Sequence, residues 1–153
     1  MYKKILFSTC LTEYCDHIFN YTINLAQENS AKLWIYYGLG RLNYDDEAKV
    51  EQAIKQAGEK VGQAYIQKMR DRGFTDYAIN VSDGDVVSEI SKLARNAGID
   101  LMVMGTSTNT PLTTGGTTNI GPLGETTAET LLWAPCPVMV IPPALIPGLA
   151  TGK

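Results

Sequence analysis

Short apolar runs alternate with longer segments of helical periodicity along the first 141 residues of this chain. Apolar runs of this length predict strands, and apolar residues that recur every three to four positions predict helices. We expect strands at residues 2–8, 31–37, 77–81, 100–105 and 137–141, and helices at residues 16–28, 47–72, 86–97 and 126–133. Strands that alternate with helices form a parallel sheet with helices on both faces. The sequence therefore predicts an α/β fold, a single-domain doubly wound five-stranded parallel sheet.

The alternation also predicts where a ligand would bind. Ligands of such sheets lie beyond the carboxyl ends of the strands, at the point where the strand order reverses. Residues 8–12 follow the first expected strand, residues 37–40 follow the second, and a segment that starts at Gly105 follows the fourth. We expect these three segments to meet at one edge of the sheet.

The segment after the fourth strand is unusually rich in hydroxyl groups and glycine. Residues 106–118 contain seven Thr and one Ser, and 19 positions separate Gly105 from Gly124. A glycine-rich connection from a strand to a helix can present backbone N–H groups to an anion. It can equally be a polar loop that satisfies itself and water. Connections of this length tend to be functional or mobile, and we expect residues 106–123 to be mobile without ligand.

Two features oppose a phosphate-binding P-loop in this segment. It lacks the GK[ST] sequence, and no Lys or Arg occurs between positions 96 and 152. Glu125 would lie at the N-terminus of the last helix, where it satisfies the helix dipole and repels phosphate. From the residues alone, a phosphate cradle and a solvated loop both remain open.

Composition and charge narrow the class of protein. The 153 residues carry a net charge of −3 and a pI near 5.1, without a basic run, so we expect no nucleic-acid partner. The first apolar run is too short for a signal peptide or a membrane span, which predicts a cytoplasmic protein without a membrane partner. Cys10, Cys15 and Cys136 form no CxxC pair. This pattern argues against a disulfide framework and a zinc site, and predicts reduced thiols.

Few side chains in the sequence could form a catalytic pair. His17, the only histidine, could pair with Cys10 or Cys15 as a nucleophile and base, but no motif joins them, and a surface or capping role is the simpler interpretation. Asp83 and Asp85 could act as an acid–base pair, although helix capping explains them better. We therefore assign no catalytic residue and no metal ligand, and we expect no enzymatic activity.

Three blocks of the chain resemble the universal stress proteins of the UspA type. These are KKILFSTCLTEY, VSDGDVVSEISKLARNAGIDLMVMGT and GETTAETLLWAPCPVMVI. The resemblance extends to about Pro142 and implies a dimeric, cytoplasmic α/β domain over residues 1–142, followed by a Pro/Gly-rich tail at 143–153. It also implies that the last strand pairs with its twin across the dimer. The interface residues would be Val138, Met139, Val140 and Ile141.

One branch of that family binds ATP through a motif of the form G-x2-G-x9-G-[ST]. Gly105 matches its first glycine, Thr108 stands at the second, and Gly124 matches the third, but the spacing is six residues longer than the motif. Glu125 stands where the family has Ser or Thr, and Thr127 matches a later phosphate-binding hydroxyl. The resemblance therefore implies an eroded ATP site.

Residues after the first two expected strands also differ from those of the nucleotide-binding members of the family. Cys10 occupies the position of an Asp that contacts the nucleoside, and Gly38 occupies the position of a small apolar residue that lines the adenine pocket. No cofactor is certain, and ATP or AMP would bind weakly if at all. The expected ligand-binding set is Thr9, Cys10, Gly38, Met104, Gly105, Thr106, Thr108, Gly124, Glu125, Thr126 and Thr127.

Three functions follow from these observations. The first is a homodimeric stress-response module with a degenerate nucleotide site. The second is an interaction dimer that binds no nucleotide. The third, weakest on chemical grounds, is a hydrolase that uses Cys10 as its nucleophile.

Overall fold

A computed structural model describes residues 1–106 and 123–143 of the chain. Every expected strand and helix is present, with ends that differ by up to three residues. The elements are β1 (Lys4–Ser8), α1 (Glu13–Asn29), β2 (Lys32–Gly38), α2 (Glu47–Asp71), β3 (Tyr77–Ser82), α3 (Val86–Ala97), β4 (Leu101–Gly105), α4 (Glu125–Trp133) and β5 (Val138–Ile141). The tail from residue 144 onward and the segment 107–122, which includes Thr108, lie outside the described residues.

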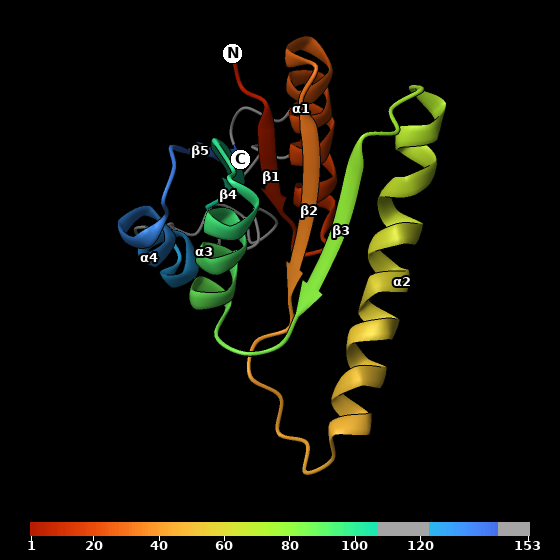
Figure 1. Cartoon of the computed structure of the whole chain (residues 1–153), viewed down its shortest axis with the longest axis vertical. Helices are drawn as coiled ribbons and strands as arrows, with labels where there is room; N and C mark the ends of the chain where they lie inside the picture. The colour runs from red at the N-terminus through yellow and green to blue at the C-terminus, as the bar shows by residue number, and fades with distance from the viewer. Residues whose placement is uncertain (107–122, 144–153) are drawn as a thin grey trace, which may run out of the picture.

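The five strands form one parallel sheet in the order β3-β2-β1-β4-β5. The chain moves outward from β1 to β3 and then returns to the other side of β1 with β4, so the order reverses between β1 and β4 (Figure 1). The doubly wound parallel sheet predicted from the sequence is confirmed. Its switch point lies at the carboxyl ends of β1 and β4, where such sheets bind ligands.

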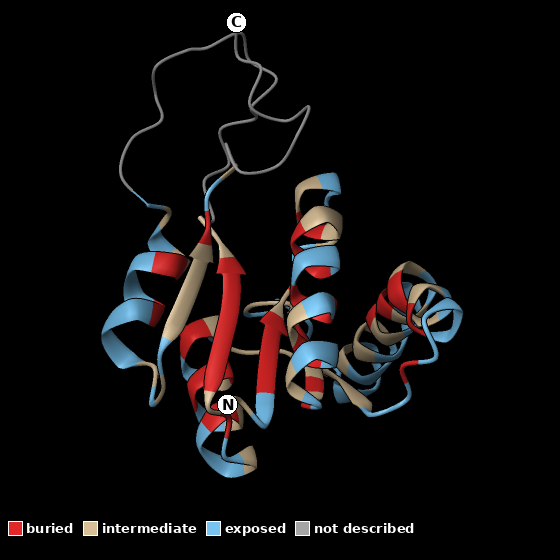
Figure 2. Ribbon diagram, turned by 90° about the horizontal axis from the view of Figure 1, so that it is seen from above, coloured by how far each residue is buried: buried red, intermediate tan, exposed pale blue. Residues whose placement is uncertain are grey.

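Side chains alternate between the two faces of the sheet along each central strand. Ile5 and Phe7 of β1 belong to a core shared with α1 and α2, whereas Leu6 belongs to a second core shared with α3. All three side chains are fully buried. Figure 2 shows the same pattern, with buried strands at the centre and exposed outer surfaces on the helices. A central strand that is buried on both faces explains why these runs are apolar at every position.

Helix α1 begins at Glu13, three residues before the start expected from its apolar stripe. Thr12 caps the helix, since its hydroxyl accepts a hydrogen bond of 3.3 Å from the backbone N–H of Cys15. Leu11 adopts a left-handed conformation with φ of 59°, which turns the chain sharply from β1 into the cap. The early start brings the first turn of α1 to the switch point.

Two other helices also begin at an aspartate cap. Asp46 accepts a 2.9 Å hydrogen bond from the N–H of Ala48 at the start of α2, and Asp85 caps α3. Among the helices that the structure describes, none is both long and apolar enough to cross a membrane.

Candidate functional site

The ends of β1 and β4 form the floor of the switch point, and α1 and α4 begin beside it. Gly105 ends β4, and Gly124 caps α4. The N–H of Gly124 donates a 2.8 Å hydrogen bond to the carbonyl of Thr106. This bond holds the start of α4 against the end of β4, although 17 residues separate its two partners in sequence. The two glycines that match the family motif are thereby brought together.

Gly105 allows α1 to pack closely on β4. A Cβ atom at this position would lie 2.8 Å from Cε2 of Tyr14 and 2.9 Å from Cδ1 of Ile18. Both distances are shorter than a carbon–carbon contact tolerates. Close packing therefore explains this glycine without a ligand.

Tyr14 joins three elements at the switch point and was not singled out by the sequence. Its hydroxyl donates to the carbonyl of Ile141 at the end of β5 and accepts a 3.2 Å hydrogen bond from the N–H of Thr106. Burial raises the pKa of this phenol, so it stays neutral and remains a donor. Tyr14 reaches this position because α1 begins at Glu13, and the apolar pattern of the sequence does not predict that early start.

The N-terminus of α4 carries the residues expected to contact phosphate. The Thr127 side chain is fully buried, and its hydroxyl donates a 2.8 Å hydrogen bond to the carbonyl of Gly105. Glu125 is exposed in the first turn, and Thr126 is half-buried. The capping residue, Gly124, has no side chain that could accept a hydrogen bond from the first turn. The hydroxyl that matches the family motif is thus engaged within the protein, and a carboxylate occupies the outer side of the helix end.

Two other expected site residues line the core. Thr9 is 5% exposed, and its hydroxyl lies 2.6 Å from the hydroxyl of Tyr65 on α2. The same Thr9 oxygen accepts a 3.0 Å hydrogen bond from the N–H of Leu11. Met104 is buried in the core on the α3 side of the sheet. Thr9 shapes the turn after β1, and Met104 supports the end of β4.

Cys10 and Cys15 meet at the carboxyl end of β1. Their sulfur atoms lie 2.7 Å apart, and the N–H of Cys10 donates to the sulfur of Cys15 over 3.2 Å. Cys10 is exposed, whereas Cys15 is 3% exposed within the core. A hydrogen bond from the Cys15 thiol, with a smaller effect of Thr12, lowers the pKa of Cys10 from 9.0 to about 6 despite partial burial. The same interaction raises the pKa of Cys15, since Cys15 keeps the proton that it donates.

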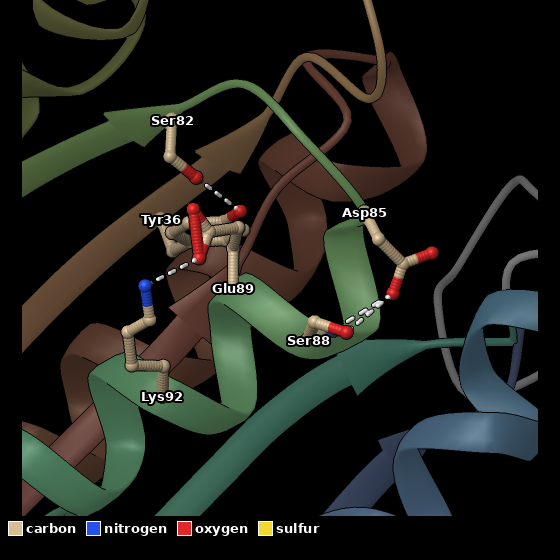
Figure 3. Close-up of polar contacts among 6 residues, drawn as sticks. All are labelled: Tyr36, Ser82, Asp85, Ser88, Glu89 and Lys92. Carbon is tan, nitrogen blue, oxygen red and sulfur yellow. Dashed lines mark hydrogen bonds and ion pairs between the residues drawn. The ribbon is translucent and has the colours of Figure 1, made fainter.

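The carboxyl end of β2 is closed by packing on α3. A Cβ atom on Gly38 would lie 2.9 Å from the Tyr36 hydroxyl and 2.9 Å from a methyl group of Val86. The Tyr36 hydroxyl in turn lies 2.7 Å from the Ser82 hydroxyl at the end of β3 (Figure 3). Gly38 therefore meets side chains of its own sheet and of α3.

The carboxyl group of Asp85 acts as a helix cap. It accepts hydrogen bonds of 3.0 Å from the N–H and 2.9 Å from the hydroxyl of Ser88 (Figure 3). These bonds, the backbone one first, lower the pKa of Asp85. A carboxyl that is engaged in this way suits a structural role better than acid–base chemistry with Asp83.

Within the described part of the chain, no hydrogen bond joins His17 to the thiols. His17 lies two residues after Cys15 on α1, and side chains at that spacing point to different sides of a helix. Within residues 1–106 and 123–143, no three His, Cys, Asp or Glu side chains form a cluster that could hold a metal ion.

Strand β5 and helix α4 both expose apolar side chains. Strand β5 lies at the edge of the sheet, and Val138, Met139 and Val140 are only partly buried. Helix α4, which precedes β5, buries polar residues and exposes apolar ones. Its buried residues are Thr127 and Thr130, whereas Leu132 is 78% and Trp133 is 67% exposed. Leu132 and Trp133 were not predicted as interface residues, because the polar and apolar positions of so short a helix show little periodicity.

Comparison with known proteins gives one consistent result. The Universal stress protein family model matches residues 1–142. UspA from Lactobacillus plantarum is 25% identical, with 92% of this chain and 97% of that chain covered and a TM-score of 0.65. A family protein from Arabidopsis thaliana with AMP bound is 18% identical (92% and 91% covered, TM-score 0.61). A universal stress protein from Archaeoglobus fulgidus in complex with dAMP is 11% identical (92% and 98% covered, TM-score 0.52). A search of curated protein sequences found no significant match.

Proposed function

Because this chain belongs to the universal stress protein family, we propose that it is a homodimeric, non-enzymatic stress-response module of the cytoplasm with a degenerate site for ATP or AMP. The observation that supports this proposal is the hydrogen bond from Gly124 to Thr106, which holds the start of α4 beside the end of β4 at the switch point, where Cys10 follows β1. Ligands of doubly wound sheets bind at this place. The Arabidopsis and Archaeoglobus proteins of the same fold hold AMP and dAMP.

Three features of the site weaken nucleotide binding. Glu125 is exposed in the first turn of α4, where a phosphate would otherwise interact with the helix dipole. Two like charges about 4 Å apart repel by ~1 kcal/mol in water and by ~4 kcal/mol at an effective dielectric constant near 20. Cys10 replaces the expected nucleoside carboxylate, which removes a charged hydrogen bond worth roughly 1.5–3 kcal/mol. The Thr127 hydroxyl already donates to the Gly105 carbonyl.

These losses set the expected affinity. At ~1.4 kcal/mol for each factor of ten, they correspond to a reduction of about a hundredfold to a hundred-thousandfold. We therefore expect a Kd for ATP of ~0.1 mM or weaker by isothermal titration calorimetry. The double variant Cys10→Asp/Glu125→Ser should bind ATP at least tenfold more tightly. Glu129→Ser is the matched control, because Glu129 is exposed on the same helix one turn further from its N-terminus.

Two outcomes would contradict the proposed site. Tight binding of ATP by the wild-type protein would show that contacts beyond the family motif compensate for the lost groups. Binding that the double variant does not improve, or that Glu129→Ser improves equally, would show that nucleotide does not lie at the N-terminus of α4. If neither protein binds ATP or AMP, and no nucleotide co-purifies by mass spectrometry, the alternative of a nucleotide-free interaction dimer is correct.

The dimer is proposed from the surface around β5. An edge strand with half-exposed valines needs a partner, and α4, which precedes β5 in the chain, also exposes Leu132 and Trp133. We expect Val140→Lys to give monomers in sedimentation velocity at micromolar concentration. Val81→Lys on β3, the opposite edge strand, is the matched control and should leave the dimer intact. A wild-type monomer would refute this part of the proposal.

A further inference from the structure

The two thiols at the end of β1 are placed for reaction with each other. Their sulfurs lie 2.7 Å apart, and a disulfide bond joins sulfurs at about 2.0 Å, so bond formation requires a movement of less than ~1 Å. The sequence does not pair these two cysteines, because they form no CxxC motif. Only the turn between β1 and α1 makes neighbours of these side chains.

We propose that Cys10 and Cys15 form a reversible intramolecular disulfide when the protein is exposed to a hydroperoxide. Cys10 is the exposed thiol that meets the oxidant, and Cys15 is the buried thiol that resolves the first product. The proposal concerns the thiols alone and does not depend on whether the protein binds nucleotide.

The backbone holds the pair in register from both sides. Cys10 follows β1, the central strand of the sheet, and Cys15 lies in the first turn of α1. The left-handed Leu11 and the Thr12 cap form the turn between them. Because a strand and a capped helix fix the two ends of this short segment, the thiols stay together in the folded chain. An unfolded chain would hold them together only part of the time.

Asymmetry between the thiols gives each a role. The Cys10 sulfur is 3.2 Å from the Thr12 hydroxyl as well as 2.7 Å from the Cys15 sulfur. These donors stabilise a thiolate on Cys10, in line with its lowered pKa. Cys136 is the internal contrast: it is half-buried, and burial raises its pKa. Peroxide reacts with thiolates that are accessible, so Cys10 should react first.

The chemistry balances with one peroxide for each disulfide. The Cys10 thiolate attacks one peroxide oxygen, the O–O bond breaks, and the departing hydroxide takes up a proton to become water. The sulfur is thereby oxidised to a sulfenic acid. The Cys15 sulfur then attacks the Cys10 sulfur, the S–O bond breaks, and the oxygen leaves as a second water with the Cys15 proton. A dithiol reductant reverses the reaction by thiol–disulfide exchange.

The test uses the full chain and hydrogen peroxide at one equivalent. We expect the free thiols, counted after denaturation, to fall from three to one per chain, and the mass to fall by two hydrogen atoms. Cleavage after Glu13, which lies between the two cysteines, should leave the fragments joined until dithiothreitol is added. Dithiothreitol should restore all three thiols.

Variants assign the roles. Cys136→Ser should oxidise like the wild-type protein. Cys15→Ser should stop at a Cys10 sulfenic acid that dimedone traps, and Cys10→Ser should lose the rapid oxidation. The same peroxide dose on the urea-unfolded chain should form far less of the Cys10–Cys15 link. Three thiols that survive peroxide in the folded protein would overturn the proposal, as would a linkage that requires Cys136 or joins two chains.

Discussion

The hydrogen bond from Cys15 to Cys10 should be visible in how fast Cys10 is alkylated at each pH. Cys15→Ala removes the donor that contributes most to the low pKa of Cys10, so this pKa should rise from about 6 toward the ordinary 9.0. Cys15→Ser keeps a hydroxyl that can donate to the thiolate and serves as the matched control. A Cys136→Ser background leaves Cys10 as the one exposed thiol.

The size of the effect follows from two opposing terms. At pH 7 a thiol with a pKa of about 6 is ~90% thiolate, whereas a thiol with a pKa near 9 is ~1% thiolate. A thiolate with a pKa lower by three units is intrinsically less nucleophilic, by roughly twentyfold at a Brønsted coefficient of 0.4–0.5. The native protein should therefore react about fivefold faster than Cys15→Ala at pH 7, yet roughly twentyfold more slowly at pH 10 and above.

The alkylation rates of the native protein and of Cys15→Ala should consequently be equal at about pH 8. The assay is iodoacetamide labelling under pseudo-first-order conditions, with the Cys10 peptide quantified by mass spectrometry from pH 5 to pH 10.5. The native protein should react faster than Cys15→Ala at low pH, because its lowered Cys10 pKa keeps the thiolate down to about pH 6. Parallel profiles for the Ala variant and the native protein would refute the role of Cys15. A Ser variant that behaves like Ala would show that the sulfur, and not a donor, is needed.

Two further expectations concern the floor of the site. Gly105→Ala should lower the free energy of unfolding by about 1–3 kcal/mol, because the added methyl group overlaps Tyr14 and Ile18. The control is Gly58→Ala on helix α2, where an added Cβ atom would have no neighbour within 4 Å. This substitution should raise the free energy of unfolding by up to ~1 kcal/mol. A Gly105→Ala protein with native stability in urea denaturation would mean that α1 can move away. Thr127→Val should cost about 1 kcal/mol through the lost hydrogen bond to the Gly105 carbonyl, whereas Thr127→Ser should cost less. A Thr127→Val protein of native stability would refute this role of the hydroxyl, whereas any loss in Thr127→Ser measures the methyl group.

The sheet could be predicted from the sequence because its signals are local and repeated. Apolar residues at every position of 5–7 and 101–104 are typical of strands buried on both faces, and Asp46 and Asp85 mark two helix starts. The sequence pattern places the start of α1 too late, at Asp16, because the regular apolar spacing is recognisable only from Ile18 onward. The cap at Thr12 was the signal that could have corrected it.

The candidate site was harder to predict, because its contacts depend on where side chains point. A motif match identifies Thr127 as a hydroxyl-bearing residue. It does not show that this hydroxyl points inward and donates to the Gly105 carbonyl. Likewise, the cysteine pattern predicts reduced thiols without a disulfide framework, and it does not show that the left-handed turn at Leu11 brings two of them together. Neither outcome follows from composition or periodicity, since both depend on the exact path of the chain between two elements.

The position of β1 between β2 and β4 has a consequence for how the chain is made. The first strand leaves the ribosome early, but its second neighbour is encoded about 90 residues later, which is roughly 5–20 s of synthesis. Only then does Asp100, just before β4, accept hydrogen bonds of 2.9 and 3.1 Å from the N–H groups of Lys3 and Lys4. Until that moment the β4-facing edge of β1 has no partner in its own chain, so the nascent protein carries an open template for mispairing. The half-sheet β1–β2–β3 with α1 and α2 is complete before β4 is synthesised, and a chaperone that shields this edge would act during that interval.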